Sequence, residues 1–292
     1  MRKLLFIINP ISGGISKHGL RKEIDVFFKN KINYSFLETK GENDKETIGL
    51  KIEEYKPTEV IACGGDGTVT LIAEILLNKP ISLGIIPLGS ANGLATELQI
   101  PQDIGESLQV ILENNTSQID VILINNKYYC LHLSDMGLNA KLIKRFSQGT
   151  QRGKVGYAKH FFDTLFNKTP KEYIFSFIEQ EEKVEYKAEM VVFANAKKYG
   201  TGAIVNPEGK IADGKFEVCI FKPYPWYAIF RLTFLFFSGQ LNYSPFVKIY
   251  STKKVQVSCK TPEHLQIDGE LMGKHRSVDV EIVPKALKML IP

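Results

Sequence analysis

The first hundred residues alternate between two hydrophobic patterns. Continuous apolar runs at 3–9 (KLLFIIN), 59–65 (EVIACGG) and 81–89 (ISLGIIPLG) run into Pro or Gly, as fully buried strands do. Residues 20–31 and 68–78 instead space their apolar side chains as helices do. Because strands that alternate with helices at this interval form βαβ units, the pattern predicts a parallel, doubly wound α/β sheet.

The segments between these runs fit the same scheme. Residues 33–39 (NYSFLET) predict another strand, and residues 91–98 (ANGLATEL) predict the start of a further helix. Residues 43–55 predict a helix, and we expect Asn43 to cap it in a capping box with Glu46.

The pattern changes near residue 120. Residues 118–134 hold two strand-like runs joined by Asn-Asn, which is a hairpin signal. One helical interval follows at 153–168. Beyond it, short runs with period-two character predict mainly antiparallel β structure, at 171–196, 215–223, 247–259, 264–270 and 277–284.

These patterns predict two domains. We expect an α/β domain over 1–121, to which a C-terminal tail at about 284–292 returns, and a β-rich domain over 122–283. The pattern changes without a Pro/Ser-rich linker, so we expect the domains to pack closely, with the active site in a cleft between them.

The composition is that of a soluble globular protein, because 44% of the 292 residues are hydrophobic and 24% are charged. The net charge of +5 fits an anionic ligand or an acidic membrane surface, and it is too small to argue for nucleic acid. No stretch reaches the roughly 18 apolar residues of a membrane span. The cysteines are far apart and form no CxxC pair, which indicates a reducing compartment, so we expect a cytoplasmic protein.

Glycine-bearing turns follow three of the predicted strands, at 9–14 (NPISGG), 64–68 (GGDGT) and 87–93 (PLGSANG). In an open parallel sheet, ligands bind at the carboxyl ends of the strands. Glycine lets backbone N–H groups approach a ligand closely, and the helix N-terminus after each turn favours anions. Together the turns predict a phosphate site, which is neither a Walker A loop nor a GxGxxG dinucleotide fingerprint.

One carboxylate, that of Asp66, lies among these glycines. It would repel a phosphate unless a cation bridged the two, so the sequence predicts Mg²⁺ on a nucleotide phosphate. The alternative is that Asp66 caps the helix that begins near Thr68, and the two roles are compatible.

In this order, the motifs NPISGG, GGDGT, PLGSANGLA and IDGE resemble those of the diacylglycerol kinase catalytic domain and its sphingosine kinase relatives, specifically the small bacterial soluble lipid kinases. Residues 152–165 and 194–221 resemble further segments of that family, so the resemblance covers nearly the whole chain. It implies a nucleotide-binding α/β domain like that of NAD kinase and phosphofructokinase, followed by an antiparallel β-sandwich domain for the lipid.

The resemblance also implies ATP and Mg²⁺ as cofactors, and it assigns roles to single residues. Asp66 would serve magnesium and the phosphates, and Glu270 would be the general base that deprotonates the lipid hydroxyl. Asp213 would hold a second, structural magnesium with the backbone carbonyls of Lys210 and Lys215. The nucleotide would contact Asn9, Ser12, Gly13, Gly14, Thr39, Gly64, Gly65, Asp66, Gly67, Thr68, Ser90 and Asn92.

When the family resemblance is set aside, residues 268–270 (DGE) predict only a type I′ hairpin turn. Departures from the family pattern at 69–71, at 90–93 and at Asn139 leave the acceptor lipid open between diacylglycerol and a long-chain base or ceramide.

Residues 224–239 hold one charge among large apolar side chains, and they predict either a buried helix or an interfacial helix that leans on a membrane. We therefore expect an ATP-dependent lipid kinase that meets its substrate at the inner face of the membrane, without a nucleic acid partner. Its oligomeric state stays open, a homodimer included. The alternatives are an inactive nucleotide- and lipid-binding sensor, and a kinase of a soluble alcohol such as NAD.

Overall fold

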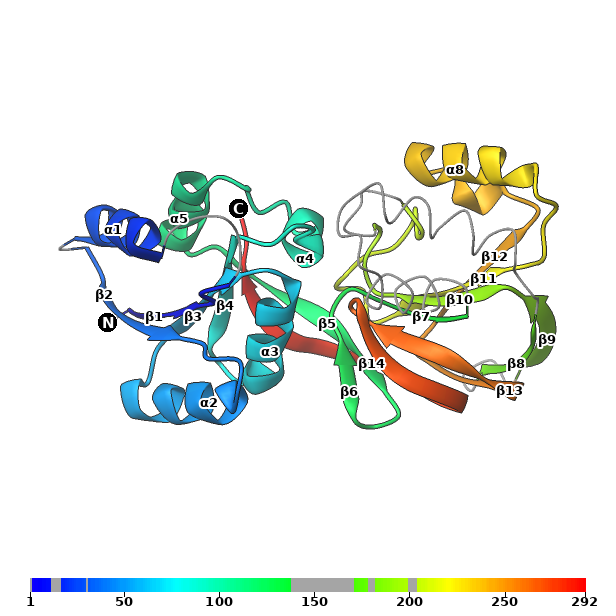
Figure 1. Ribbon diagram of the computed structural model, residues 1–292, viewed down its shortest axis with the longest axis horizontal. Helices are drawn as coiled ribbons and strands as arrows, with labels where there is room; N and C mark the ends of the chain where they lie inside the picture. Colours follow the sequence, from blue (N-terminus) through cyan, green and yellow to red (C-terminus); the bar gives the residue numbers. More distant parts are fainter. Residues whose placement is uncertain (1, 12–16, 30, 138–170, 178–181, 199–203) are drawn as a thin grey trace. The chain divides into compact units, whose positions relative to one another are not determined.

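The computed structural model describes every residue except 1, 12–16, 30, 138–170, 178–181 and 199–203 (Figure 1). The chain divides into two compact units, the first formed by residues 1–119 with 285–292 and the second by residues 120–284. It passes from one unit to the other within β5 (Thr116–Ile124) and again within β14 (Glu270–Leu290). The predicted helix at 153–168 lies outside the described residues.

The first unit contains a parallel sheet in the strand order β14-β4-β3-β1-β2. Met289 of β14 pairs with Leu83 of β4, which places the C-terminal strand beside β4. The sheet confirms the predicted α/β class. The other elements are β1 (Lys3–Ile8), α1 (Lys17–Phe28), β2 (Asn33–Glu38), α2 (Asp44–Tyr55), β3 (Glu59–Gly64), α3 (Asp66–Leu76), β4 (Ser82–Pro87), α4 (Gly93–Glu97) and α5 (Ile104–Glu113).

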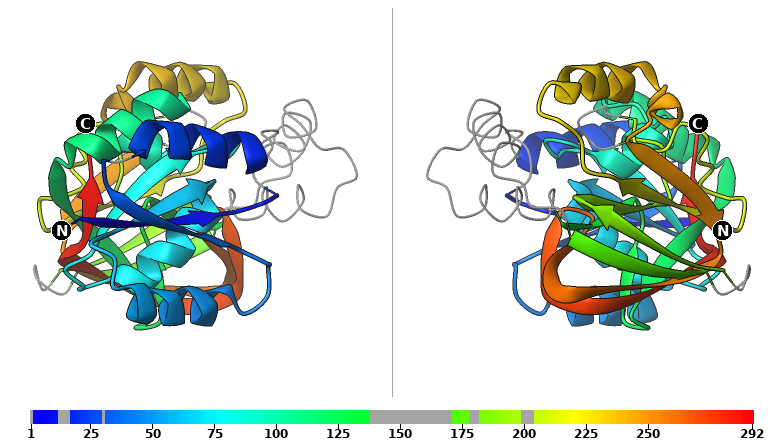
Figure 2. Two further views of the ribbon diagram at one scale, coloured as in Figure 1. Left: turned by 90° about the vertical axis from the view of Figure 1, so that its left-hand side faces the viewer. Right: turned by 90° about the vertical axis from the view of Figure 1, so that its right-hand side faces the viewer.

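Helices cover both faces of this sheet, which explains why its central strands are continuous apolar runs. Leu4, Phe6 and Ile8 of β1 belong to a buried cluster with side chains of α1 and α5. The helices α2 and α3 lie on the opposite face (Figure 2). Because both faces are buried, the backbone groups at the strand ends are the part of the sheet that remains for a ligand.

The start of α2 differs from the prediction. Asn43 has a φ of 55° and makes no side-chain cap hydrogen bond, so the predicted capping box with Glu46 is wrong. A residue that caps through its side chain usually has an extended backbone, and the left-handed conformation of Asn43 does not provide that geometry. Instead, the Asp44 carboxylate accepts the N–H groups of Lys40 and Gly41, at 2.8 and 2.9 Å.

The second unit is antiparallel in its described strand pairs, as predicted. Its strand order is β12-β11-β10-β7-β13-β14-β5-β6, and β8 pairs with both β13 and β9. The other elements are β6 (Tyr128–Cys130), β7 (Leu133–Gly137), β8 (Lys171–Phe177), β9 (Glu182–Ala188), β10 (Met190–Ala194), β11 (Phe216–Phe221), α8 (Ala228–Ser238), η2 (Leu241–Tyr243), β12 (Val247–Thr252) and β13 (Lys254–Ile267).

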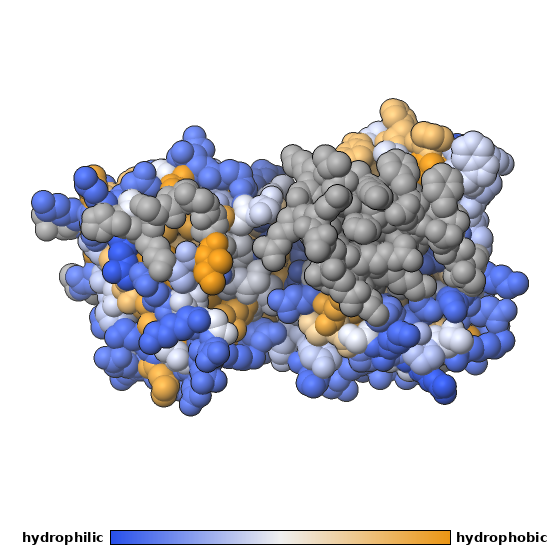
Figure 3. Space-filling model, viewed as in Figure 1, coloured by the Kyte–Doolittle hydropathy of each residue, from blue (hydrophilic) through white to orange (hydrophobic). Residues whose placement is uncertain are grey.

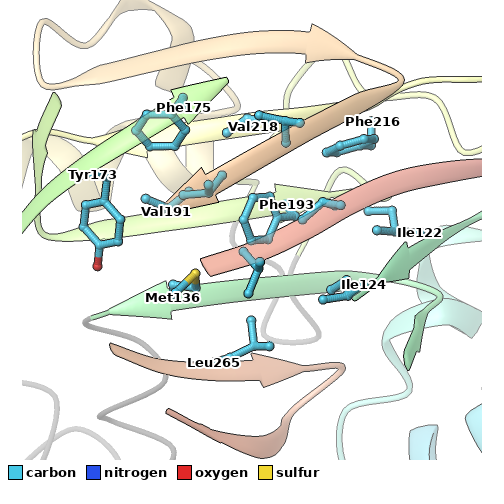
Figure 4. Close-up of a cluster of buried hydrophobic side chains, with 14 of the residues drawn as sticks. Ile122, Ile124, Met136, Tyr173, Phe175, Val191, Phe193, Phe216, Val218 and Leu265 are labelled. Atoms are coloured by element: carbon cyan, nitrogen blue, oxygen red, sulfur yellow. The ribbon is translucent and has the colours of Figure 1, made fainter. Parts of the chain in front are cut away.

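Buried aromatic side chains hold these strands together. Tyr173, Phe175 and Phe193 are fully buried in one apolar cluster with side chains from β5, β7, β11 and β13 (Figure 4). The predicted hairpin between β5 and β6 is also present. Asn125 and Asn126 form its turn with φ values of 54° and 51°, which is the type I′ geometry that asparagine tolerates.

The apolar stretch at 224–239 forms α8, which begins at Ala228 and ends at Ser238. Gly239 follows in a left-handed conformation with a φ of 70°, and its N–H donates to the carbonyl of Leu235, which ends the helix. Among the helices that the structure describes, none has both the length and the apolar character needed to cross a membrane.

Candidate nucleotide site and the Glu270 turn

The turns that follow β1, β3 and β4 meet at one edge of the first unit's sheet. The N–H of Asn9, just after β1, donates to the carbonyl of Cys63 in β3 at 3.0 Å. The N–H of Leu88, just after β4, donates to the carbonyl of Gly64 at 2.9 Å. These bonds continue the sheet beyond its strands, so the three turns have fixed positions relative to one another.

Asn9 and Thr68 connect two of these turns through their side chains. The Asn9 amide donates to the Thr68 hydroxyl at 3.0 Å, and its oxygen accepts the N–H of Ile11 at the same distance. A Cβ atom on Gly64 would overlap that hydroxyl, so glycine is required for Thr68 to pack against the end of β3. The predicted residue Thr39 is at the same edge, where its N–H donates to the carbonyl of Ile8 at 3.0 Å.

The turns after β3 and β4 contact each other backbone to backbone. A Cβ atom on Gly89 would lie 2.5 Å from the Cα atom of Gly65. The buried Asn92 fixes the second turn, because its oxygen accepts the N–H of Gly89 at 2.8 Å and its amide donates to the carbonyl of Gly89 at 3.0 Å. The amide also donates to Gln102 at 2.8 Å. Asn92 therefore shapes the turn, while the predicted Ser90 is exposed on it.

Asp66 joins the same two turns. It is the first residue of α3, and its carboxylate lies near the backbone N–H groups of Asn92, Gly93 and Leu94 at the start of α4, which favour its charged form. Burial raises the pKa of this carboxyl, and the three N–H donors oppose that rise. The alternative that Asp66 caps its own helix is wrong, since Gly65 is the N-cap residue of α3. The side chain of Asn92 is hydrogen-bonded within its own turn and does not cap α4.

This arrangement fits Mg²⁺ bound to a phosphate better than a protein cage for a metal. Asp66 is the one carboxylate among the predicted nucleotide residues, and it is only partly buried. Mg²⁺ usually needs only one or two carboxylates, since phosphate oxygens and water complete its shell. In the part of the chain that the structure describes, no group of three His, Cys, Asp or Glu side chains is placed to hold a metal ion.

The first turn of α3 suits a phosphate. Its N–H groups lie at a helix N-terminus directly after a buried strand, and Gly67 is exposed there. The structure thus brings together Asn9, Thr39, Gly64, Gly65, Asp66, Gly67, Thr68, Ser90 and Asn92 of the predicted nucleotide residues. Ser12, Gly13 and Gly14 lie outside the described residues.

The predicted residues of the second magnesium site lie in one loop of the second unit, before β11. The Asp213 carboxylate accepts the N–H of Lys215 at 3.1 Å, and both residues are exposed, as is Lys210. The buried carboxylate of Asp120 holds this loop by accepting the N–H of Gly214 at 2.6 Å. The magnesium role of the loop stays a prediction.

Glu270 is the exposed first residue of β14, directly after a tight turn. Asp268 and Gly269 form that turn with φ values of 47° and 92°, which confirms the predicted type I′ hairpin. The N–H of Gly269 donates to the side-chain oxygen of Gln266 at 2.8 Å. Hydrogen bonds of the neighbouring residues therefore hold the backbone of Glu270 in place.

The sequence analysis missed the residue that fixes this turn. The Asp268 carboxylate accepts the N–H groups of Leu131, His132 and Leu133, at 2.8, 3.0 and 3.1 Å. Burial raises the pKa of the Asp268 carboxyl to about 6, although these N–H donors act in the opposite direction. The sequence did show that Asp268 places a carboxylate within a predicted hairpin turn. It could not show that this carboxylate binds the segment before β7.

Comparison with known proteins decides the family. The family model of the diacylglycerol kinase catalytic domain matches residues 3–124, and that of the YegS C-terminal NAD kinase beta sandwich-like domain matches residues 135–291. The second match alone spans more than half of the chain. The chain belongs to the diacylglycerol kinase family of lipid kinases.

Individual members of the family agree with this assignment. A protein of Staphylococcus saprophyticus named diacylglycerol kinase is 27% identical over 281 residues, which cover 94% of this chain and 91% of that protein. The crystal structure of a diacylglycerol kinase from Bacillus anthracis has a TM-score of 0.78 at 19% identity and covers 100% of this chain and 97% of its own.

The fold is shared more widely. An NAD kinase from Archaeoglobus fulgidus, solved in complex with ATP, has a TM-score of 0.54 at 11% identity, with 99% of this chain and 93% of that chain covered. These likenesses confirm the predicted fold class, an NAD kinase-like α/β domain followed by a β-sandwich.

The contact between Gly65 and Gly89 gives a test of the candidate site. Gly89 does not have a positive φ, so only the close approach requires glycine there. We expect Gly89→Ala to push the two turns apart, to lower the free energy of unfolding by about 1–3 kcal/mol and to weaken ATP binding by about tenfold or more. Urea denaturation and calorimetric titration with ATP measure the two effects.

Gly49→Ala in α2 is the matched control, because a Cβ atom there has no neighbour within 4 Å. We expect it to leave ATP binding unchanged and to stabilise the protein by about 0.5–1 kcal/mol. Normal ATP binding by Gly89→Ala would contradict the placement of the site at these turns.

The pKa of Asp268 predicts a dependence of stability on pH. Since the folded pKa of about 6 lies above the value of an unfolded aspartate, about 3.9, the folded state binds the proton more tightly. The contribution of Asp268 to the free energy of unfolding therefore falls, by about 2–3 kcal/mol, as pH rises from about 4 to about 6. Asp268→Asn should remove this slope, which urea denaturation of both proteins over that range will measure. Parallel curves for the two proteins would contradict the assignment.

Proposed function

We propose that this member of the diacylglycerol kinase family transfers the γ-phosphoryl group of ATP to the hydroxyl of a lipid, either diacylglycerol or a long-chain base or ceramide. One observation carries the proposal. The turns after β3 and β4 contact each other through Gly65 and Gly89, and the Asp66 carboxylate of the first turn lies near the N–H groups that follow the second. Backbone of this kind at the carboxyl edge of a parallel sheet suits a triphosphate.

The first unit supplies the nucleotide site in this proposal. The N–H groups at the start of α3 bind phosphate oxygens, and the exposed Ser90 and the hydrogen-bonded Asn9–Thr68 pair line the same edge. When bound, Mg²⁺ would neutralise the charge that develops on the phosphate during transfer. Asp66 would hold that ion as the carboxylate among these turns.

The second unit supplies the proton acceptor. Glu270 is exposed on a turn that Asp268 and Gln266 hold, and its carboxylate takes the proton from the lipid hydroxyl as the hydroxyl oxygen attacks phosphorus. Asp268 is a positioning residue, because it acts through the backbone of the turn. Asp213, with the carbonyls of Lys210 and Lys215, would hold a second magnesium, which would stabilise their loop.

The acceptor is tested with purified protein, labelled ATP and a panel of diacylglycerol, monoacylglycerol, sphingosine and ceramide, with NAD as the soluble acceptor. We expect magnesium-dependent transfer of label to at least one lipid and none to NAD. Transfer to NAD alone, or ATP binding without transfer to any acceptor, would contradict the lipid kinase assignment and favour the soluble-alcohol kinase or the inactive sensor, respectively.

The role of Glu270 has a separate test. Glu270→Gln keeps the shape of the side chain and removes the proton acceptor, so turnover should fall by about 10²–10⁴-fold. ATP affinity should change by no more than a few fold, because the nucleotide residues belong to the first unit. Initial rates and calorimetric titration with ATP measure these two quantities.

The control is Glu281→Gln on the same strand, where the carboxylate only pairs with Lys254 at 2.6 Å on the surface. We expect normal turnover from it. If Glu270→Gln turned over as fast as this control, Glu270 would not be the base.

A further inference from the structure

The helix α8 is apolar on two opposite sides. One set of side chains packs on strands β10, β11 and β12, and the other set projects away from them. The packed set is Ala228, Leu232 and Leu235, and the exposed set is Phe230, Phe234 and Phe237. Each exposed phenylalanine follows a packed residue by two positions, which is about 200° around a helix. A helix that is apolar all round is expected to be covered on all sides.

The exposed side extends beyond the helix. Trp226 and Tyr227 directly precede α8, and Tyr243 lies in η2 just after it. With the exposed phenylalanines 230, 234 and 237 they form what we call the α8 patch, and each of its side chains is more than 60% exposed. In the part of the chain that the structure describes, nine large apolar side chains are exposed, and six of them belong to this patch. Figure 3 shows hydrophobic side chains exposed on the surface at α8.

Most of the charged residues near the patch in the sequence are positive. From Val218 to Pro262 the sequence contains no aspartate and no glutamate, but it contains six lysines and arginines, of which Lys254 and Lys260 pair with Glu281 and Glu172. One carboxylate, that of the exposed Glu208, accepts a hydrogen bond from Asn242 beside Tyr243. Arg231 is on α8 itself and is exposed, and Lys222 precedes the helix. A second copy of this chain would bring two such positive surfaces together, which costs electrostatic energy. An anionic surface is complementary to the patch.

The side chains themselves favour a lipid surface. Tryptophan and tyrosine are enriched where a bilayer meets water, because each has an apolar body and a polar tip. Phenylalanines with a neighbouring arginine match the pattern of helices that lie in the plane of the headgroups. The packed side of α8 is anchored in a buried cluster, so its exposed side is already formed before it meets a surface.

We propose that the α8 patch inserts into the headgroup region of an anionic bilayer and holds the second unit there. The helix then lies in the plane of the interface, with its phenylalanines among the upper parts of the acyl chains and Arg231 among the lipid phosphates. The inference rests on the proposed function in one respect, that the bilayer is where the enzyme finds its acceptor lipid. It adds the surface of the molecule that makes the contact.

The double variant Phe230→Ser with Phe234→Ser tests the patch. We expect it to sediment with vesicles of equimolar phosphatidylcholine and phosphatidylglycerol at least about tenfold more weakly than the wild type. Leu50→Ser is the control, because Leu50 is an equally exposed apolar residue on α2, 61% accessible, and should leave vesicle binding unchanged. Arg231→Gln should reduce the preference for these vesicles over pure phosphatidylcholine.

Three results would overturn the proposal. The first is wild-type sedimentation by the double variant. The second is a melting temperature far below that of the wild type, which would mean that the two phenylalanines belong to the core. The third is a wild-type dimer that the double variant turns into monomers in sedimentation velocity, which would make the patch an interface between copies.

Activity assays separate this proposal from the lipid kinase assignment. We expect the double variant to phosphorylate a dispersed short-chain acceptor normally and an acceptor within vesicles at least about tenfold more slowly. If the wild type phosphorylated no lipid, the proposed function would fail, while vesicle sedimentation would still decide the role of the α8 patch.

Discussion

The close approach of the turns after β3 and β4 is the constraint on which the candidate site depends. The Asp66 carboxylate of the first turn lies near N–H groups at the start of α4, the helix that follows the second turn. The contact of Gly65 with Gly89 requires that Gly89 has no side chain, because a Cβ atom there would lie 2.5 Å from the Cα atom of Gly65. Gly89 therefore serves the close packing of one turn on the other, and in the proposed function the glycines also give phosphates access to the backbone.

The sequence predicted the fold because its signals are local. Apolar runs that end at glycine or proline marked the parallel strands, and Asn125-Asn126 marked the hairpin at its observed position. The capping box at Asn43 failed for an equally local reason, since the left-handed backbone there is set by the preceding loop, which the Asp44 carboxylate binds. Residue type indicates that a cap is possible, but the path of the incoming chain decides which residue provides it.

The parts of the site that sequence did not reveal depend on distant partners. Asp268 was predicted only as a turn residue, although its carboxylate binds N–H groups as far as 137 positions away in the chain. Asn92 was predicted to contact the nucleotide, and the structure shows its side chain bound to Gly89 and Gln102. Asp268 thereby positions the backbone that carries Glu270 in the second unit. Asn92 positions the turn that leads into α4 in the first unit.

Hydrogen exchange with and without Mg-ATP tests whether this edge of the sheet binds the nucleotide. The account predicts slower exchange of backbone amides in residues 64–68 and 88–94 at saturating Mg-ATP, and unchanged exchange in the β8–β9 hairpin. Unchanged exchange in both turns, with ATP binding shown in the same sample, would contradict it, because the nucleotide would then bind elsewhere.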